Sequence, residues 1–227
     1  MAGPLVIAID PGHGGEKRSG STAARTLSSP NNARTPSGIA EKTLTLELAD
    51  DLRQALETEA AKRGIILTVI MTRTSDENPD FAERTARCLA AGTAPAAIVS
   101  IHFNASEKHN ALGSLGMIAH PSRNPHADRD RAFADGLAAA CSTAVRQYLP
   151  ASKPLATITD AHLHGGKGSN FFHQIAKRPE LASTPVCFLE IEFIDRKDVD
   201  EALIARRAEA FPKIAQAIAR QLLDDRK

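Results

Sequence analysis

Short apolar runs alternate along the chain with stretches whose apolar residues recur every four positions. The runs have the length and β-branched content of buried strands, and they cover Leu5–Ile9, Ile65–Met71, Ala97–Ile101, Leu115–Ala119 and Val186–Glu190. Between them lie three helical stripes, formed by Leu44, Leu48, Leu52 and Leu56, by Phe133, Leu137 and Cys141, and by Ile214, Ile218 and Leu222. This alternation predicts an α/β fold, with a mostly parallel twisted sheet and helices on both faces.

Two segments interrupt the pattern. Residues 16–40 are rich in Ser, Thr, Asn, Gly and Pro, and residues around 150–185 contain the run His162-Leu-His164-Gly-Gly-Lys-Gly. We predict that both are long loops, which in compact domains are often functional. Because the strand after the second loop is needed to complete the same sheet, we expect residues 1–227 to form a single domain.

Two further features concern helices. Phe81–Ala91 has the pattern of a short additional helix. Pro212 interrupts the last apolar stripe, which indicates either two helices or one kinked helix there.

Composition excludes several partner classes. The chain has 227 residues, is 42% apolar and carries a formal net charge of +1, which gives no global reason to bind nucleic acid or an anionic membrane. The run Leu5–Ile9 is too short to insert into a membrane and lacks the flanks of a signal peptide. Cys88, Cys141 and Cys187 are an odd set in apolar surroundings, so we expect buried thiols and no disulfide.

Polar residues with metal-binding chemistry follow three of the predicted strands. His13 lies on a glycine-rich turn directly after the first strand, His102 ends the third, and Glu190 ends the last. Since ligand sites in open parallel sheets lie outside the carboxyl ends of the strands, these side chains should converge at one edge. Glu41 opens the helix that follows the first strand, which brings a second carboxylate to the same edge.

Two imidazoles and one carboxylate form the ligand set of a catalytic zinc site. Bound zinc lowers the pKa of water from about 15.7 to about 7, and a carboxylate outside the ligand set can then take its proton. The residue types alone leave open whether Glu41 or Glu190 is the base.

Four segments carry a family resemblance. Ile-Asp-Pro-Gly-His-Gly-Gly, Glu-Lys-Thr-Leu-Thr-Leu, Ser-Ile-His-Phe-Asn-Ala and Phe-Leu-Glu-Ile-Glu-Phe resemble, in this order, the signature segments of the zinc-dependent N-acetylmuramoyl-L-alanine amidases of type 3. The resemblance implies that His13, Glu41 and His102 bind one zinc ion per chain and that Glu190 is the catalytic residue. It also implies a peptidoglycan substrate, cleaved between N-acetylmuramic acid and L-alanine.

The chain departs from the family pattern at two places. Glu192 stands where glycine is usual, and since Glu190 and Glu192 alternate on one strand, Glu192 is an alternative base if the register differs. Residues 16–40 form a longer segment between the first two ligands than is typical, and this segment could shape the substrate cleft.

Further residues have two interpretations each. Asp10 either orients an imidazole or is a turn residue. Asn104 either contacts substrate or caps the loop after His102, and we favour the cap. His162 and His164 are either additional ligands or substrate contacts, or exposed loop residues, and we favour exposure.

Two cations are also candidates. Arg73 and Lys167 either steer the carboxylates of a stem peptide or are solvated surface charges.

Two other functions compete with the amidase hypothesis. One is a zinc hydrolase acting on another bond of the stem peptide, and the other is a non-catalytic peptidoglycan-binding regulator with the same fold. Because peptidoglycan lies outside the cytoplasm, the resemblance implies action in the periplasm or cell wall. Export, cell lysis and delivery by a secretion system are all compatible with the sequence.

Overall fold

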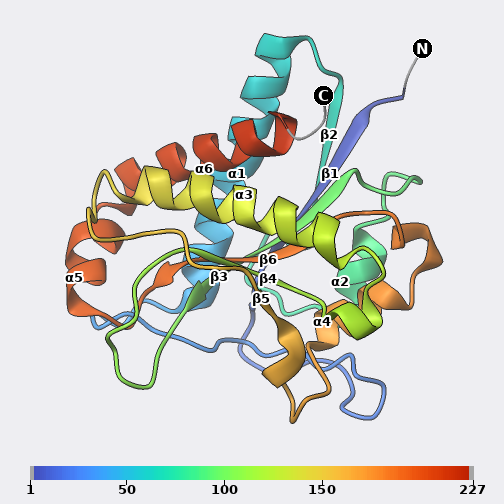
Figure 1. The fold of residues 1–227 in the computed structure, drawn as a ribbon, viewed down its shortest axis with the longest axis horizontal. Coiled ribbons are helices and arrows are strands. Elements are labelled where there is room, and N and C mark those ends of the chain that lie inside the picture. The colour runs from blue at the N-terminus through green and yellow to red at the C-terminus, as the bar shows by residue number, and fades with distance from the viewer. Residues whose placement is uncertain (1–2, 225–227) are drawn as a thin grey trace.

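Six strands form one sheet in the order β2-β1-β3-β6-β4-β5 (Figure 1). The computed structural model describes residues 3–224, apart from the side chain of His162. The strands are β1 Leu5–Pro11, β2 Leu67–Met71, β3 Ala97–Asn104, β4 Leu115–Ile118, β5 Ile158–Thr159 and β6 Val186–Phe193. All neighbouring pairs are parallel except β4 and β6, which confirms the mostly parallel sheet.

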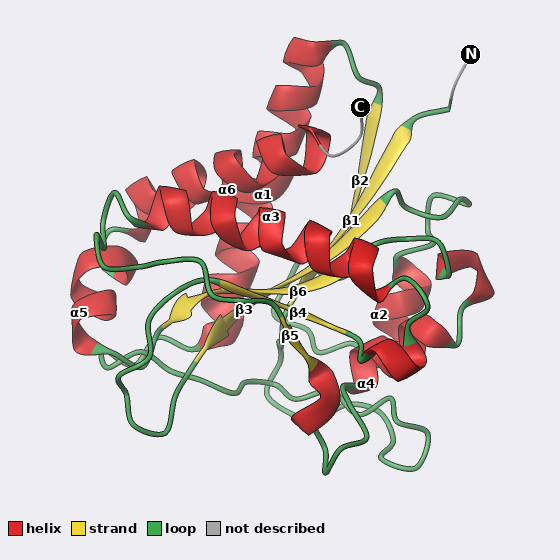
Figure 2. Cartoon of the chain, viewed as in Figure 1, coloured by secondary structure: helices red, strands yellow, loops and turns green. Residues whose placement is uncertain are grey.

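Helices cover both faces of this sheet, as predicted (Figure 2). They are α1 Glu41–Arg63, α2 Phe81–Arg87, α3 Ala127–Val145, α4 Asn170–Ala176, α5 Lys197–Val199 and α6 Arg207–Asp224, with a π-helical turn at Asp200–Ile204 between the last two. Ile7 and Ile9 of β1 pack into the core shared with α1, α3 and α6, whereas Val6 and Ala8 face the core that contains α4. Because successive side chains of a strand point to opposite faces of the sheet, β1 contributes residues to both cores.

The predicted helical stripes are buried. The four leucines of the α1 stripe are fully buried, and α1 is followed by Gly64, whose φ of 66° gives the helix a left-handed cap. The C-terminal apolar stripe lies on one helix, α6, with Pro212 inside it. Of the two predicted alternatives, two helices or one, the structure therefore shows one. Helix α2 ends at Arg87, four residues earlier than predicted.

The two segments predicted as long loops differ from each other. Residues 16–40 contain only the isolated bridges Ser19–Ser28 and Arg34–Ala40. The second segment, residues 150–185, contains β5 and α4 as well as loop, so the prediction of a continuous loop is wrong there. Helix α4 begins after Ser169, whose side chain accepts a hydrogen bond from the Phe171 backbone N–H, and its two phenylalanines are buried.

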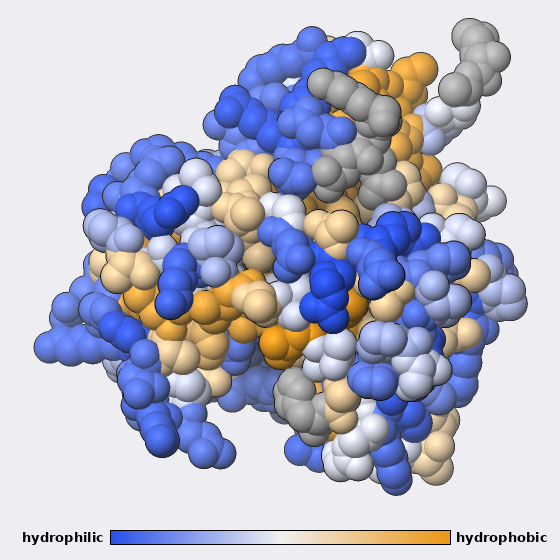
Figure 3. Space-filling view, viewed as in Figure 1, coloured by the Kyte–Doolittle hydropathy of each residue, from blue (hydrophilic) through white to orange (hydrophobic). Residues whose placement is uncertain are grey.

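The surface is largely polar. Figure 3 shows an apolar strip just below α3, in the region of β4 and β5, where Ile158 is exposed. Within residues 3–224, no helix combines the length and apolar character needed to cross a membrane. The three cysteines are buried and free, as predicted.

Candidate metal centre

A strained turn presents the first histidine. Strand β1 ends at Pro11, and His13, Gly14 and Gly15 follow with φ angles of 60°, 128° and 63°. A non-glycine residue with positive φ is uncommon, and such strain concentrates at functional sites. Gly12 lies so close to the imidazole of His102 that an added Cβ would be 2.2 Å from the ring. Glycine at this position therefore lets the second histidine pack against the turn that carries the first.

Two buried guanidinium groups hold the backbone of this turn. Arg73 donates hydrogen bonds to the carbonyls of Pro11 (3.0 Å) and Gly12 (2.9 Å). Arg84 donates to the carbonyls of Pro11 (2.8 Å) and His13 (2.6 Å). Each arginine is 1% exposed. Since buried carbonyl groups need hydrogen-bond donors, the two arginines fix the backbone of the turn.

Asp10 supplies the counter-charge for one of these arginines. Its carboxylate lies 2.8 Å from Arg84 Nη1 and accepts hydrogen bonds from Ser100 Oγ at 2.6 Å and from Thr72. Burial raises the pKa of Asp10, but Arg84 and the hydroxyl donors outweigh it, so the pKa lies below the usual value. No hydrogen bond joins Asp10 to His13 or His102; Asp10 acts on the turn through Arg84, and its negative charge partly opposes the lowering of the His102 pKa by burial.

His13, Glu41 and His102 converge into one buried group. His13 Nε2 lies 3.2 Å from Glu41 Oε2, and His102 Nδ1 lies 3.1 Å from Glu41 Oε1. One ligand atom from each residue falls within 4.8 Å of the others. The sequence therefore correctly predicted that the carboxyl edge brings these three residues together.

The hydrogen bonds around this group fit a cation. His13 Nδ1 lies 3.0 Å from the Ser29 carbonyl, which can only accept, so Nδ1 carries the hydrogen. His13 Nε2 has no hydrogen-bond partner although it is buried. In the neutral ring, a nitrogen lone pair thus faces the carboxylate of Glu41, an arrangement that a cation between them would stabilise.

Electrostatics keeps Glu41 ionised and His102 neutral. Burial raises the pKa of Glu41, but interaction with the two imidazoles, above all with the positive charge that His13 carries when protonated, overcomes this and lowers it to about 2. Burial lowers the pKa of His102 to about 4. A carboxylate and a neutral imidazole are the forms that bind metal ions.

Glu190 lies on the strand beside His102. The two residues are direct partners in the parallel pairing of β3 and β6, so their side chains share one face. Glu190 is buried and its Oε2 has no hydrogen-bond partner. Burial, together with the negative charge of Glu41, raises its pKa well above the usual value. Phe188 stacks on the His102 ring at 3.8 Å and fixes its orientation.

Glu192 and Asn104 bind neighbouring backbone. Glu192 accepts hydrogen bonds from the Gly113 N–H (2.6 Å) and from Ser152 Oγ (2.5 Å), so both carboxylate oxygens join β6 to flanking loops. Asn104 Oδ1 accepts from the Ala105 N–H at 2.8 Å, as expected of a loop cap.

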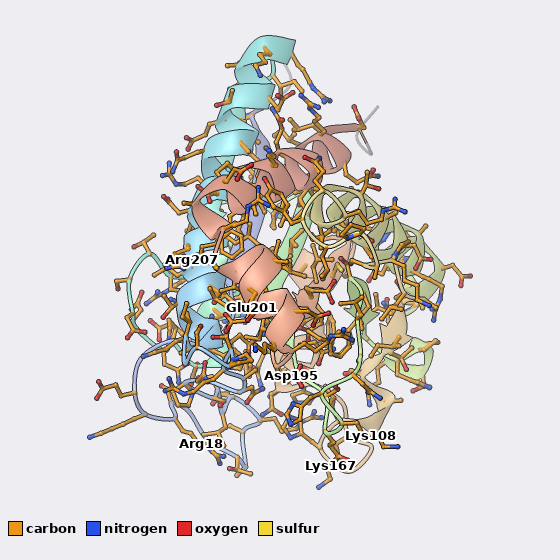
Figure 4. The ribbon with its side chains drawn as sticks, turned by 90° about the vertical axis from the view of Figure 1, so that its left-hand side faces the viewer. Arg18, Lys108, Lys167, Asp195, Glu201 and Arg207 are labelled. Carbon is orange, nitrogen blue, oxygen red and sulfur yellow. The ribbon has the colours of Figure 1, made fainter. Side chains whose placement is uncertain are left out.

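The remaining candidates lie outside the buried group. Arg73 is neither a surface charge nor exposed to substrate, because it is buried and binds backbone carbonyls. His164 and Lys167 are exposed, and the side chain of His162 lies outside the described part of the structure. In the side view of Figure 4, Lys167 and Lys108 lie on loops at the lower end of the molecule.

Sequence reasoning missed three contributors: Arg84, Ser29 and Phe188. Arg84 binds backbone carbonyls of the turn, and Ser29 binds His13 through its own backbone carbonyl. Every residue has a backbone carbonyl, so the residue types in the sequence do not reveal these contacts. Phe188 had a usable signal, because it precedes Glu190 by two residues on a strand and therefore shares its face.

Comparison with known proteins identifies the family of the chain. The sequence model for the family N-acetylmuramoyl-L-alanine amidase matches residues 7–224. The probable N-acetylmuramoyl-L-alanine amidase AmiB of Haemophilus influenzae is 33% identical over 116 residues, which cover 50% of this chain and 22% of that protein. The matched segment thus spans about a fifth of the length of this relative.

Solved structures share the fold over nearly the whole chain. The N-acetylmuramoyl-L-alanine amidase AmiC2 of Nostoc punctiforme superposes with a TM-score of 0.66 at 20% identity, covering 99% of this chain and 98% of AmiC2. Cwp6 from Clostridium difficile gives 0.68 at 23% identity, covering 100% of this chain and 30% of Cwp6. The CwlD amidase from Clostridioides difficile, solved in complex with the GerS lipoprotein, gives 0.63 at 17% identity, with 97% of each chain covered.

Proposed function

This chain belongs to the N-acetylmuramoyl-L-alanine amidase family, and from that premise we propose that it hydrolyses the amide bond between N-acetylmuramic acid and L-alanine of peptidoglycan. The observation that carries the proposal is the buried His13–Glu41–His102 group with the unpartnered carboxyl of Glu190 beside it. We further propose that one zinc ion per chain binds this group and that the enzyme acts in the periplasm or cell wall.

The three ligands would bind zinc through His13 Nε2, a Glu41 oxygen and His102 Nδ1, the atoms that face one another. When bound, zinc supplies Lewis acidity, which polarises a carbonyl and lowers the pKa of water to about 7. The backbone N–H groups of Ala33 and Phe103 donate hydrogen bonds to the two carboxylate oxygens of Glu41, at 3.3 and 3.1 Å. These donors hold the carboxylate towards the two imidazoles.

Glu190 is the proposed general base. It is the one carboxyl of β6 with a free, buried oxygen, whereas both oxygens of Glu192 bind loop donors. A carboxyl with a raised pKa suits both halves of the reaction, since it takes a proton from the attacking water and returns it to the leaving amine. Glu192 is proposed to support the loops around the site.

Digestion of purified sacculi tests the bond that is cleaved. Mass spectrometry should find peptides that begin with L-alanine and glycan chains with free lactyl groups. Shortened peptides still attached to muramic acid would instead identify a peptidase of the stem peptide. An intact sacculus with bound protein would identify a non-catalytic binding protein.

A matched pair of variants tests the base. Glu190→Gln should bind zinc as the wild type does but lose activity by a factor of roughly 10² to 10⁴, the usual contribution of general acid–base catalysis. Glu192→Gln is the control, because it makes the same change two residues away. An inactive Glu192→Gln beside an active Glu190→Gln would refute the assignment.

A further inference from the structure

The orientation of His13 depends on a segment without regular structure. The Ser29 carbonyl, which accepts from His13 Nδ1, belongs to residues 16–40, where no helix or strand fixes the backbone. A metal-binding imidazole needs its other nitrogen anchored, because the anchor sets both the tautomer and the ring orientation. Beside Ser29, the Pro30 carbonyl accepts from the Gly14 N–H at 3.1 Å, so the position of Ser29 depends on this contact and on the contacts that hold the residues before it.

Arg25 connects this segment to the loop before α4. Its guanidinium donates to the carbonyls of Lys167 (2.9 Å) and Gly168 (2.8 Å) and to Asn170 Oδ1 (3.3 Å), and it lies 3.2 Å from His173 Nδ1. Arg25 itself has a φ of 55°, a conformation that needs support from its contacts. One side chain from the first loop thus joins several groups of the second.

Two side chains of α4 donate three hydrogen bonds to the backbone of the first loop. Gln174 Nε2 donates to the Ala24 and Arg25 carbonyls, each at 3.0 Å, and Asn170 Nδ2 donates to the Leu27 carbonyl at 3.1 Å. Asn170 and Gln174 are buried, and Phe171 is fully buried in the core on this face of the sheet. The helix therefore provides a rigid support for residues 24–27.

We propose that Arg25 is a positioning residue that latches residues 16–40 to α4 and thereby holds the Ser29 carbonyl against His13 Nδ1. The latch keeps His13 in the tautomer whose Nε2 faces Glu41. The inference rests on the proposed zinc site, but the tautomer of His13 is a property of the protein alone. Without the latch, the ring exchanges between tautomers and zinc binding weakens.

Two substitutions at the latch and one control test this inference. Arg25→Ala removes all the guanidinium contacts, and Arg25→Lys keeps the charge but replaces a multiple donor with a single ammonium group. Arg34→Ala is the control, because Arg34 is exposed in the same segment and its side chain donates only to the Gly38 carbonyl at 3.0 Å. Thermal unfolding of each variant establishes that the fold is retained.

Zinc affinity, measured by competition with a chromophoric chelator, is the first readout. Arg25→Ala should weaken binding roughly 10- to 100-fold, the usual effect of losing support behind a ligand, with Arg25→Lys in between and Arg34→Ala unchanged. In the hydrolysis assay at saturating zinc, kcat should fall more than KM rises. Equal zinc affinity in folded Arg25→Ala and wild type would overturn the proposal.

The ¹⁵N chemical shifts of the His13 imidazole in the metal-free protein are the second readout. The wild type should show an Nδ1 that is fully protonated, because it donates to the Ser29 carbonyl, and Arg25→Lys should show an Nδ1 that is protonated for only part of the time. This measurement separates the latch from the proposed function. A wild type that binds no zinc would refute the function, whereas a single unchanged tautomer in both Arg25 variants would refute the latch.

Discussion

Replacing Gly12 with alanine should damage the metal centre without touching any ligand. The new Cβ would be 2.2 Å from Cε1, 2.4 Å from Nε2 and 2.6 Å from Nδ1 of His102. Ordinary carbon contacts need about 3.5 Å, so the ring has to retreat by more than about 1 Å. Such overpacking costs about 1–3 kcal/mol. If the metal-bound geometry carries this cost, zinc binding weakens by roughly 5- to 150-fold.

Isothermal titration of zinc into the metal-free protein measures this effect. Gly136→Ala on α3 is the matched control, since the three heavy atoms nearest to its Cβ would all belong to the flexible side chain of Gln221, the first at 2.9 Å. Alanine is the better helix former by about 1 kcal/mol, so this control should be at least as stable as the wild type and bind zinc equally well. A thermal melt of both variants separates loss of zinc from loss of fold.

The result that would refute the reasoning is wild-type zinc affinity in Gly12→Ala. It would mean that the His102 ring can leave Gly12 and still reach the metal. The stack of Phe188 on that ring would then not limit its position.

Three further perturbations address stability and metal linkage. Zinc at 100 times its Kd should stabilise the protein by about 2.7 kcal/mol in urea unfolding, and a chelator should reverse this and abolish hydrolysis; activity that survives chelation would contradict a zinc mechanism. Asp10→Asn should destabilise the fold by about 3–5 kcal/mol at neutral pH, because it leaves the buried Arg84 without its counter-charge. The pKa of Asp10 in the folded protein lies below the unfolded value of 3.8. The difference in unfolding free energy between wild type and Asp10→Asn should therefore be full above pH 3.8 and shrink as pH falls through the folded pKa. A difference that does not change with pH would rule out the ion pair as its cause. Arg73→Met should leave buried carbonyls of Pro11 and Gly12 short of donors and lower the free energy of unfolding by about 1–3 kcal/mol, and a smaller change would show that water replaces the guanidinium.

Much of the fold follows from the hydrophobic pattern, because each long element buries one face or both. The failures are the elements too short to show a period. Strand β5 has two residues, and α4 has seven within a segment rich in glycine and polar residues. Their positions depend on tertiary contacts, such as the burial of Phe171, that a local pattern does not contain.

The candidate site also contains residues that the sequence could place and residues that it could not. His102 and Glu190 could be placed at one edge of the sheet in advance, because both lie at the ends of strands in a predicted parallel sheet, whereas their pairing on neighbouring strands comes from the structure. Arg73 could not be assigned, since a guanidinium that binds backbone carbonyls looks in sequence like one exposed to solvent. The same limit applies to the Ser29 carbonyl, whose partner His13 lies sixteen residues away.

The position of β6 in the sheet also determines when the site can be completed during synthesis. In chain order β1, β2 and β3 can pair as soon as they emerge, but β4 and β5 have no sheet neighbour among them. Strand β6 joins the two parts, and it also carries Glu190. The nascent chain thus holds all three proposed ligand residues by residue 102 and gains the proposed base only with the strand that joins the two parts of the sheet. The proposed base and the completed sheet therefore arrive together, before α6 adds its side chains to the core.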